Sequence, residues 1–257
     1  MNEKNDFALV PRPSGALEKV QPGAKRVLSS MVADTLALVP KEKDVSLSRK
    51  FRIGDYEWCE PDYRQILLWA KALSMEPQEV IRRLLDPGPE YTNVAMKDTI
   101  FADGRMQALN WDYYQLPLVA FDWVAGLTLK SLSLGAPAPE SFLVAATPNL
   151  PPLTFLSYSA RGLPALSLSP VPLLTQLWCD QNELTKLDLS AVPLLRELHC
   201  EMNNLVELDL AAVPMLTQLW CWDNQLTDLD IRPLQNLQKL HFDTDSARLI
   251  QRPNQHF

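Results

Sequence analysis

Glycine is scarce in this chain, with 8 glycines among 257 residues against 21 prolines. The glycines lie at positions 15, 23, 54, 88, 104, 126, 135 and 162, so that no GxGxxG or GxxxxGK[ST] loop can be written. Those loops need glycine because only glycine lets the backbone approach a phosphate closely. The motif-based case for a Rossmann or P-loop nucleotide enzyme is therefore absent.

Histidine and cysteine are also few, with 3 histidines and 4 cysteines. This supply leaves little room for a multi-histidine metal site, a histidine-based triad or a disulfide scaffold. We therefore expect no cofactor, no metal and no enzyme activity. An enzyme hidden in the N-terminal half stays an alternative, but its scattered acids are more simply read as a solvated, helix-capping loop. These acids are Asp55, Glu57, Glu60 and Asp62.

Long apolar runs are missing as well. No segment reaches the roughly 18 apolar residues of a membrane-spanning helix, and the best run, 116–129, is broken by Asp122. The start, MNEKNDFALVPRPSG, lacks the apolar region of a standard secretory signal. These features predict a cytoplasmic protein without a membrane partner. A protein exported by a machine that reads a disordered N-terminus would share them, so export stays open.

The formal charge of -7 is unevenly distributed. Residues 1–95 carry 14 Lys+Arg and 14 Asp+Glu, which leaves 24 − 14 = 10 and 31 − 14 = 17 for the remainder. The second part therefore carries the whole net charge, which argues against non-specific coating with nucleic acid. Two regions of different charge indicate two modules.

A period of 21 residues dominates the second half of the chain. Lines of 21 from Pro151 align without gaps, for example PLLTQLWCDQNELTKLDLSAV above PLLRELHCEMNNLVELDLAAV, and the half-line QNLQKLHFDTD ends the series. The segment LKSLSLG (129–135) joins the same leucine columns after a 24-residue spacing. One such line cannot bury its leucines alone, so the lines must stack as turns of a solenoid.

The shared pattern, LxxLxCxxNxLxxLDLSxxPx, resembles the short leucine-rich repeat of bacterial proteins over about residues 129–245. The resemblance implies a solenoid, a non-enzymatic protein-interaction module, and a bacterial cytoplasmic protein or an effector delivered to a host cell. The pattern also has an asparagine column, whose amides we expect to satisfy buried backbone groups of neighbouring turns. An aspartate column in the outer LDL segment is expected to face solvent. These columns are Asn182, Asn203 and Asn224, and Asp188, Asp209 and Asp230.

Three cysteines, Cys179, Cys200 and Cys221, repeat at the same spacing. Side chains alternate along a strand, so Leu177 and each cysteine point inward while the residue between them points outward. A stacked cysteine column suggests a metal site, but its other members favour a packing position that tolerates bulk. Those other members are Tyr158 and Phe242.

The outward column collects aromatic rings on what should be the concave face: Ser133, Ser157, Trp178, His199, Trp220 and His241. A flanking column adds Asp180, Glu201, Trp222 and Asp243. Exposed aromatic side chains favour a contact surface, and the carboxylates favour a protein partner with lysine or arginine groups. The histidines would make that contact pH-sensitive. As the alternative, the rings stack on each other and only stabilise the sheet.

A second resemblance concerns PDYRQILLWAKALSMEPQEVIRRLL (61–85), which is similar to the rear half of a lambda-repressor-like helix-turn-helix domain. The residues in register are Pro61, Ile66, Trp69, Ala70, Ala72, Leu73, Pro77 and Val80. The front half matches poorly. The resemblance implies a recognition helix within 45–52, with Arg49, Lys50 and Arg52 on DNA, and makes a DNA-binding regulator the alternative function. Otherwise this region is a helical domain that packs on the solenoid or on a partner.

The remaining patterns complete the architecture. Periodic apolar residues predict helices over 24–39, 61–73 and 76–86, the second with Ile66, Leu67, Trp69, Ala70 and Leu73 inward. Asp103-Gly104 predicts a hairpin turn. An aromatic cluster between 111 and 123 is expected to cap the solenoid, with a small-ligand pocket as the alternative.

The sequence therefore predicts an α+β chain, a helical N-terminal domain followed by a leucine-rich-repeat solenoid. The expected divisions are a flexible leader (1–24), a helical domain (25–89), a connecting and capping segment (90–128), the repeats (129–245) and a C-terminal tail (246–257).

Overall fold

The computed structural model describes residues 49–85, 99–111, 125–134, 151–159 and 162–255, and two short strands nearer the N-terminus. The chain divides into two compact units, Met1–Val39 and Pro40–Phe257. In the first unit, β1 (Leu9–Pro11) pairs antiparallel with β2 (Leu17–Lys19). The helix expected over 24–39 lies outside the described residues.

The second unit begins with a hairpin of β3 (Lys50–Ile53) and β4 (Tyr56–Cys59), followed by α2 (Glu60–Leu73) and α3 (Pro77–Leu85). Both helices start with a proline in the first turn, where a missing N–H costs no hydrogen bond. The structure describes the end of the segment 45–52, in which a recognition helix was expected, and residues 50–53 form a strand there. The prediction of a recognition helix is therefore wrong for these residues. A helical domain over 25–89 is likewise not shown.

Helix α2 buries one stripe of side chains against the rest of the unit. The buried positions 62, 65, 66, 69 and 70 follow the spacing of a single helix face. Leu67, which was expected to point inward, is 37% exposed, and its neighbour Leu68 is 44% exposed. Leu67 therefore lies outside the buried stripe, and the prediction is wrong for this residue.

Asp62 is the main departure from the expected solvated acidic loop, because its side chain is fully buried. Its Oδ1 accepts a hydrogen bond of 2.7 Å from the backbone N–H of Met106, and its Oδ2 lies 3.1 Å from Nε of Arg105. Arg105 also donates to the carbonyl of Gly126 at 2.7 Å. Burial raises the pKa of Asp62, and the Met106 and Arg105 contacts oppose that rise. This buried pair ties α2 to the following hairpin.

That hairpin consists of β5 (Ile100–Ala102) and β6 (Arg105–Trp111), and it confirms the predicted turn. Asp103 and Gly104 adopt φ of 55° and 77°, and a Cβ on Gly104 would lie 2.8 Å from the Glu57 carbonyl oxygen. Only glycine fits this close approach. Trp111 then packs edge-to-face on Trp69 with ring centroids 5.1 Å apart, joining the hairpin to α2.

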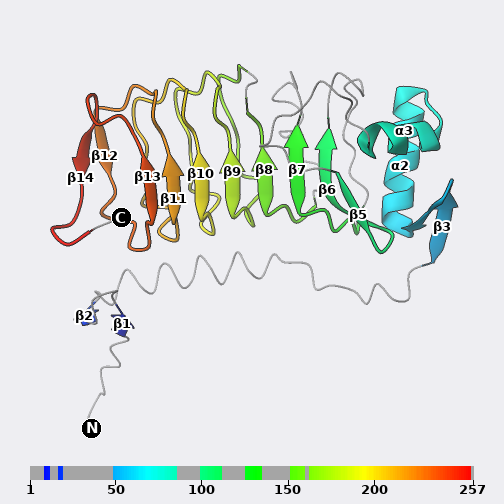
Figure 1. The fold of residues 1–257 in the computed structure, drawn as a ribbon, viewed down its shortest axis with the longest axis horizontal. Coiled ribbons are helices and arrows are strands. Elements are labelled where there is room, and N and C mark those ends of the chain that lie inside the picture. The colour runs from blue at the N-terminus through cyan, green and yellow to red at the C-terminus, as the bar shows by residue number, and fades with distance from the viewer. Residues whose placement is uncertain are drawn as a thin grey trace, which may run out of the picture. The chain divides into compact units, whose positions relative to one another are not determined.

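From β6 onward the chain forms a β-solenoid with one strand per turn (Figure 1). Its inner strands are β7 (Ser131–Leu134), β8 (Phe155–Ser157), β9 (Gln176–Trp178), β10 (Glu197–His199), β11 (Gln218–Trp220) and β13 (Lys239–His241). The eight-stranded sheet runs in the order β13-β11-β10-β9-β8-β7-β6-β5, and is parallel except for the β5–β6 hairpin. The predicted leucine register is confirmed, with Leu132, Leu156, Leu177, Leu198, Leu219 and Leu240 aligned across it.

Between the strands, the asparagine column makes the predicted backbone contacts. The amide nitrogen of Asn203 donates to the carbonyls of Cys179 and Cys200 at 3.0 and 3.1 Å. Its Oδ1 accepts from the backbone N–H of Leu184 at 3.1 Å. Asn182 and Asn224 repeat these contacts one turn earlier and one turn later. Each amide therefore joins adjacent turns where no regular strand pairing is available.

The far end of the solenoid carries a second, outer sheet in which β12 (Asp228–Asp230) pairs in parallel with β14 (Arg248–Ile250) (Figure 1). The side chain of Gln255 donates to the carbonyls of Ile231 and Leu234 at 2.9 and 2.6 Å. The residues after the repeats thus pack against the last turn. Within the described residues, no helix is long and apolar enough to cross a membrane.

Candidate functional site

The outward column of the last four inner strands forms a continuous stack of rings, which we call the ring ladder: Trp178, His199, Trp220 and His241. Strand pairing places these residues directly opposite one another. Successive ring centroids are 5.0, 4.0 and 5.5 Å apart, with interplanar angles of 49°, 13° and 8°. The predicted cross-strand stacking is confirmed, and it occurs on the face that was predicted to bind a partner.

The ring ladder does not extend into the first turns. Ser133 and Ser157 belong to the same outward column but are 0% and 1% exposed, so their predicted exposure is wrong. Phe155 beside them is also buried, and its ring meets Trp178 edge-to-face at 5.4 Å. Strand alternation fixes the side to which a residue points, but not whether other segments cover that side.

His199 stands at the centre of the ring ladder between two carboxylates. Its Nε2 lies 3.1 Å from Oε1 of Glu197, and its Nδ1 lies 3.6 Å from Oε1 of Glu201. A neutral imidazole carries a single N–H, so acceptors on both sides favour the doubly protonated ring. Burial lowers the pKa of His199, but the two carboxylates together outweigh burial and raise it.

Glu197 was missing from the predicted site, although it holds the ring ladder together. Its Oε2 accepts from the side-chain amide of Gln176 at 2.8 Å, and its Oε1 accepts from the Trp178 indole N–H at 3.4 Å. The signal was present in the sequence as Glu-x-His-x-Glu. Strand alternation puts all three of these side chains on one face, since they are spaced by two residues.

The flanking column lies two residues beyond the ring ladder in each turn, on the same face: Asp180, Glu201, Trp222 and Asp243. Asp243 Oδ2 accepts from the backbone N–H of Asp223 at 2.7 Å. Glu201 Oε2 is buried and has no hydrogen-bond donor among the described residues. Trp222 is 37% exposed. The structure brings four of the predicted partner-binding residues together as the ring ladder and places Glu201 beside His199. We call the surface expected to carry the ring ladder and the flanking column the ladder face.

The cysteine column lies on the opposite, inner side of the same strands. Cys179, Cys200 and Cys221 are at most 1% exposed, which confirms the packing interpretation. The thiols of Cys179 and Cys200 each lie 3.4 Å from a carbonyl oxygen of the next strand. Burial raises the pKa of all three, to about 12 for Cys221. Among the described residues, no group of histidine, cysteine and acidic side chains is arranged to hold a metal ion.

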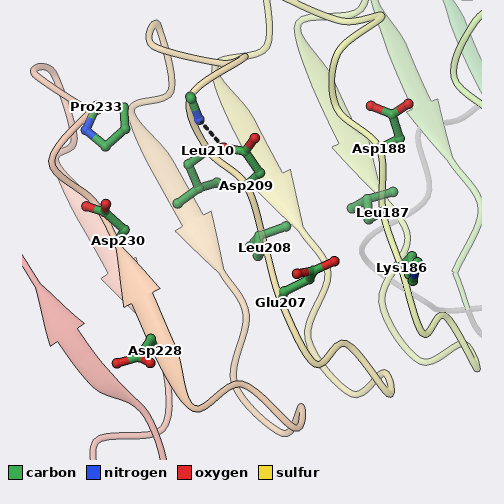
Figure 2. A pocket seen from close by; sticks show the side chains of 11 residues that line it. Lys186, Leu187, Asp188, Glu207, Leu208, Asp209, Leu210, Asp228, Asp230 and Pro233 are labelled. Carbon is green, nitrogen blue, oxygen red and sulfur yellow. Dashed lines mark hydrogen bonds between the residues drawn. The ribbon is translucent and has the colours of Figure 1, made fainter.

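An acidic groove of about 460 Å³ lies on the outer side of the turns (Figure 2). The predicted aspartate column lines it, and each of these aspartates accepts the backbone N–H two residues later at 2.9–3.0 Å. The groove also contains Asp228, which pairs with Arg248 at 2.7 Å, while Asp230 pairs with Arg232. Much of this negative charge therefore stabilises turns or is already paired.

The three residues predicted to contact DNA lie at the β3–β4 hairpin rather than on a helix. Arg49, Lys50 and Arg52 are exposed, and the Arg49 guanidinium lies 5.4 Å from the centre of the Phe51 ring. A β-hairpin cannot place a recognition helix in the major groove of DNA, as the prediction required. DNA binding by these residues stays a prediction.

The described turns each have one inner strand with an inward leucine, and three of them carry an inter-turn asparagine (Asn182, Asn203 and Asn224). This arrangement defines a leucine-rich-repeat-like β-solenoid. No protein-family model matches the sequence, and no curated protein does. Several solved structures are similar to it. The functional domain of InlJ from Listeria monocytogenes, described as including a cysteine ladder, is 21% identical over 60% of this chain and 38% of that chain, with a TM-score of 0.35.

Two others are leucine-rich-repeat domains. That of APL1B is 18% identical over 77% of this chain and 51% of its own, with a TM-score of 0.37. That of APL1 is 20% identical over 48% of this chain and 44% of its own, with a TM-score of 0.26. The chain therefore spans between 38% and 51% of the chains it resembles. With all three TM-scores below 0.5, the class rests on the repeat and its geometry in this chain.

Proposed function

We propose that the ladder face binds a protein partner that presents lysine or arginine side chains, without an enzymatic reaction. The observation that carries the proposal is the unbroken stack of four aromatic rings beside carboxylates on the outward side of the sheet. Aromatic side chains concentrate binding energy in interfaces because they bury large, rigid surfaces. In this chain they are aligned over successive turns, which suits an extended contact.

The charge of the ladder face supports a basic partner. Four carboxylates lie in or beside the ring ladder, on Asp180, Glu197, Glu201 and Asp243. Lys239, at the end of the sheet, is the basic residue in the equivalent columns. Complementary charge accelerates association and rejects acidic competitors. Binding should therefore weaken as salt concentration rises.

The test uses the full chain as bait in its native cells, followed by mass spectrometry. The triple variant Trp178→Ala, Trp220→Ala, Trp222→Ala should lose partners that the wild type retains. The matched control is Val206→Ala with Glu207→Gln, which changes exposed residues outside the ladder face and should keep them. Partners retained equally by both variants would contradict the proposal.

Thermal unfolding of the same variants separates binding from stability. Each lost ring contact should cost about 0.2–1 kcal/mol, so the triple variant should stay folded at the capture temperature. A collapse of its melting temperature would instead favour a purely structural ladder. The identified partner, purified, should then bind more weakly at higher salt.

The cellular setting is also a proposal. We propose a bacterial cytoplasmic protein, with delivery into a host cell as the alternative, and the support is the resemblance of the repeat. Fractionation of the native culture, compared with a culture in which dedicated export machines are inactivated, distinguishes the two.

A further inference from the structure

Trp222 differs from the tryptophans of the ring ladder. Trp220 is stacked between the rings of His199 and His241, and Trp178 contacts the rings of Phe155 and His199. Trp222 has no ring contact among the described residues and is 37% exposed. Its indole can therefore accept a flat group from a partner, and it is the tryptophan of the ladder face without a stacked neighbour among the described residues.

The solenoid places a carboxylate in the same column on each side of Trp222. Glu201 lies one turn before it and Asp243 one turn after it, each 21 residues away. Adjacent turns are about 4.8 Å apart, so both side chains are within reach of a group that lies on the indole. Asp243 is held in place because its Oδ2 accepts the neighbouring backbone N–H of Asp223 at 2.7 Å.

Glu201 adds a hydrogen-bonding capacity that the described chain leaves unused. Its Oε1 faces Nδ1 of His199 at 3.6 Å, while its buried Oε2 lacks a donor among the described residues. A buried acceptor without a donor is costly and is rare in folded proteins. The side chain as a whole is 14% exposed, so a change of its rotamer would bring Oε2 to a cationic N–H donor of a partner and remove this cost.

We infer that Trp222, Glu201 and Asp243 form a slot for one arginine side chain of the partner. The guanidinium would stack on the indole and direct its N–H groups to the two carboxylates. Arginine suits the slot better than lysine because its planar group combines stacking with hydrogen bonds along its edges. This inference deepens the proposed function and rests on it for the biological partner.

The test follows the tryptophan indole N–H signals of the full chain by NMR during titration with the peptide acetyl-Gly-Arg-Gly-amide. The matched probe replaces arginine by citrulline, which keeps the shape but is neutral. The signal of Trp222, assigned with Trp222→Phe, should shift saturably with the arginine peptide and not with the citrulline peptide. The corresponding lysine peptide should bind several-fold more weakly than the arginine peptide.

Two charge-removing variants locate the slot further. Asp243→Asn and Glu201→Gln should each weaken arginine binding by about tenfold, as expected for loss of a charge-assisted contact. Asp188→Asn, on the outer side of the turns, should have no effect. Amide spectra of each variant would verify that it is folded, and Trp222→Leu provides a second variant that removes the indole.

Equal shifts with arginine and citrulline, or equal shifts of several indole signals, would overturn the slot. Its failure can be distinguished from failure of the proposed function. If partner capture depends on Trp178 and Trp220 but the arginine peptide does not bind, the slot is wrong and the proposed function stands. If the peptide binds Trp222 but the triple variant captures every partner, the proposed function is wrong.

Discussion

The regular turns and the first part of the solenoid are held together in different ways. In the turns that contain β9, β10 and β11, the same asparagine, aspartate and leucine positions recur and make equivalent contacts. Before β7, the connection depends on contacts that occur once, above all the buried pair of Asp62 and Arg105. Repetition distributes stability over many similar contacts, whereas the first part concentrates it in a few.

The outward columns differ in the same way. In β7 and β8 this column presents buried serines, and in β9, β10, β11 and β13 it presents the ring ladder. The aromatic rings of this column are therefore confined to the regular turns. Four substitutions or titrations, each with an internal control, examine this difference.

The largest effect is expected from Asp62→Ala. The substitution leaves the Arg105 guanidinium buried without its carboxylate and removes the acceptor of the Met106 N–H, which should cost about 3–5 kcal/mol. Glu60→Ala, on the same helix, removes an exposed pair with Arg64 and should cost less than about 1 kcal/mol. Urea unfolding measures both. Similar losses would show that Asp62 does not hold the first part in place.

Asn203→Ala should destabilise the regular turns by about 1–3 kcal/mol, because it leaves the buried N–H of Leu184 without its acceptor and removes one of the two amide donors of the Cys179 and Cys200 carbonyls. The matched control is Asn204→Ala, whose side chain makes one exposed contact of 3.3 Å with Gln225. The same unfolding measurement compares them. A loss no greater than that of the control would refute the role of the asparagine column.

Trp220→Ala should cost about 1–2 kcal/mol, since it removes two ring contacts of the ladder. Ser133→Ala, in the same column, should be neutral or slightly stabilising because the Ser133 hydroxyl is buried and has no hydrogen-bond partner among the described residues. Melting temperatures of the two variants check this contrast. A larger loss for the serine variant would reverse the assignment of the two regions.

The smallest effect concerns pH. The pKa of His199 is raised in the folded chain because Glu201 and Glu197 outweigh the opposing effect of burial. The folded state therefore binds the proton more tightly than the unfolded state, whose histidine pKa is about 6.5. The resulting stabilisation is fully present below that pH and is lost as pH rises through the folded pKa.

The variant His199→Gln tests this linkage. Urea unfolding of the wild type and the variant is compared between about pH 6 and pH 9, and the advantage of the wild type should shrink as pH rises. NMR titration of the His199 ring provides the folded pKa directly. An advantage that grows with pH would mean that the neutral ring is the stabilised form.

Periodicity explains which features were predictable from the sequence. A fixed 21-residue spacing and strand alternation were enough to identify the inward leucines and cysteines, the bridging amides such as Asn203, and the alignment of the ring ladder. The turn at Asp103-Gly104 was predictable because its backbone conformation has strict residue preferences.

The other features depend on contacts between residues far apart in the sequence. Asp62 appears in the sequence as one acid among several, and its burial is explained only by its ion pair with Arg105, which lies 43 positions later. The basic stretch at 49–52 was assigned to a helix from a partial resemblance, but pairing with β4 makes it a strand. Local pattern could not reveal either partner.

Each regular turn contributes one inner strand and one ring, so the ring ladder can change in length by whole turns. Removal of residues 193–213 would take out one complete coil and leave the flanking coils in phase, with Trp178 brought beside Trp220. Duplication of the same stretch would insert another imidazole between indoles. The length of the ring ladder is thus adjustable in whole modules, and gain or loss of a coil need not disturb the inward packing of its neighbours.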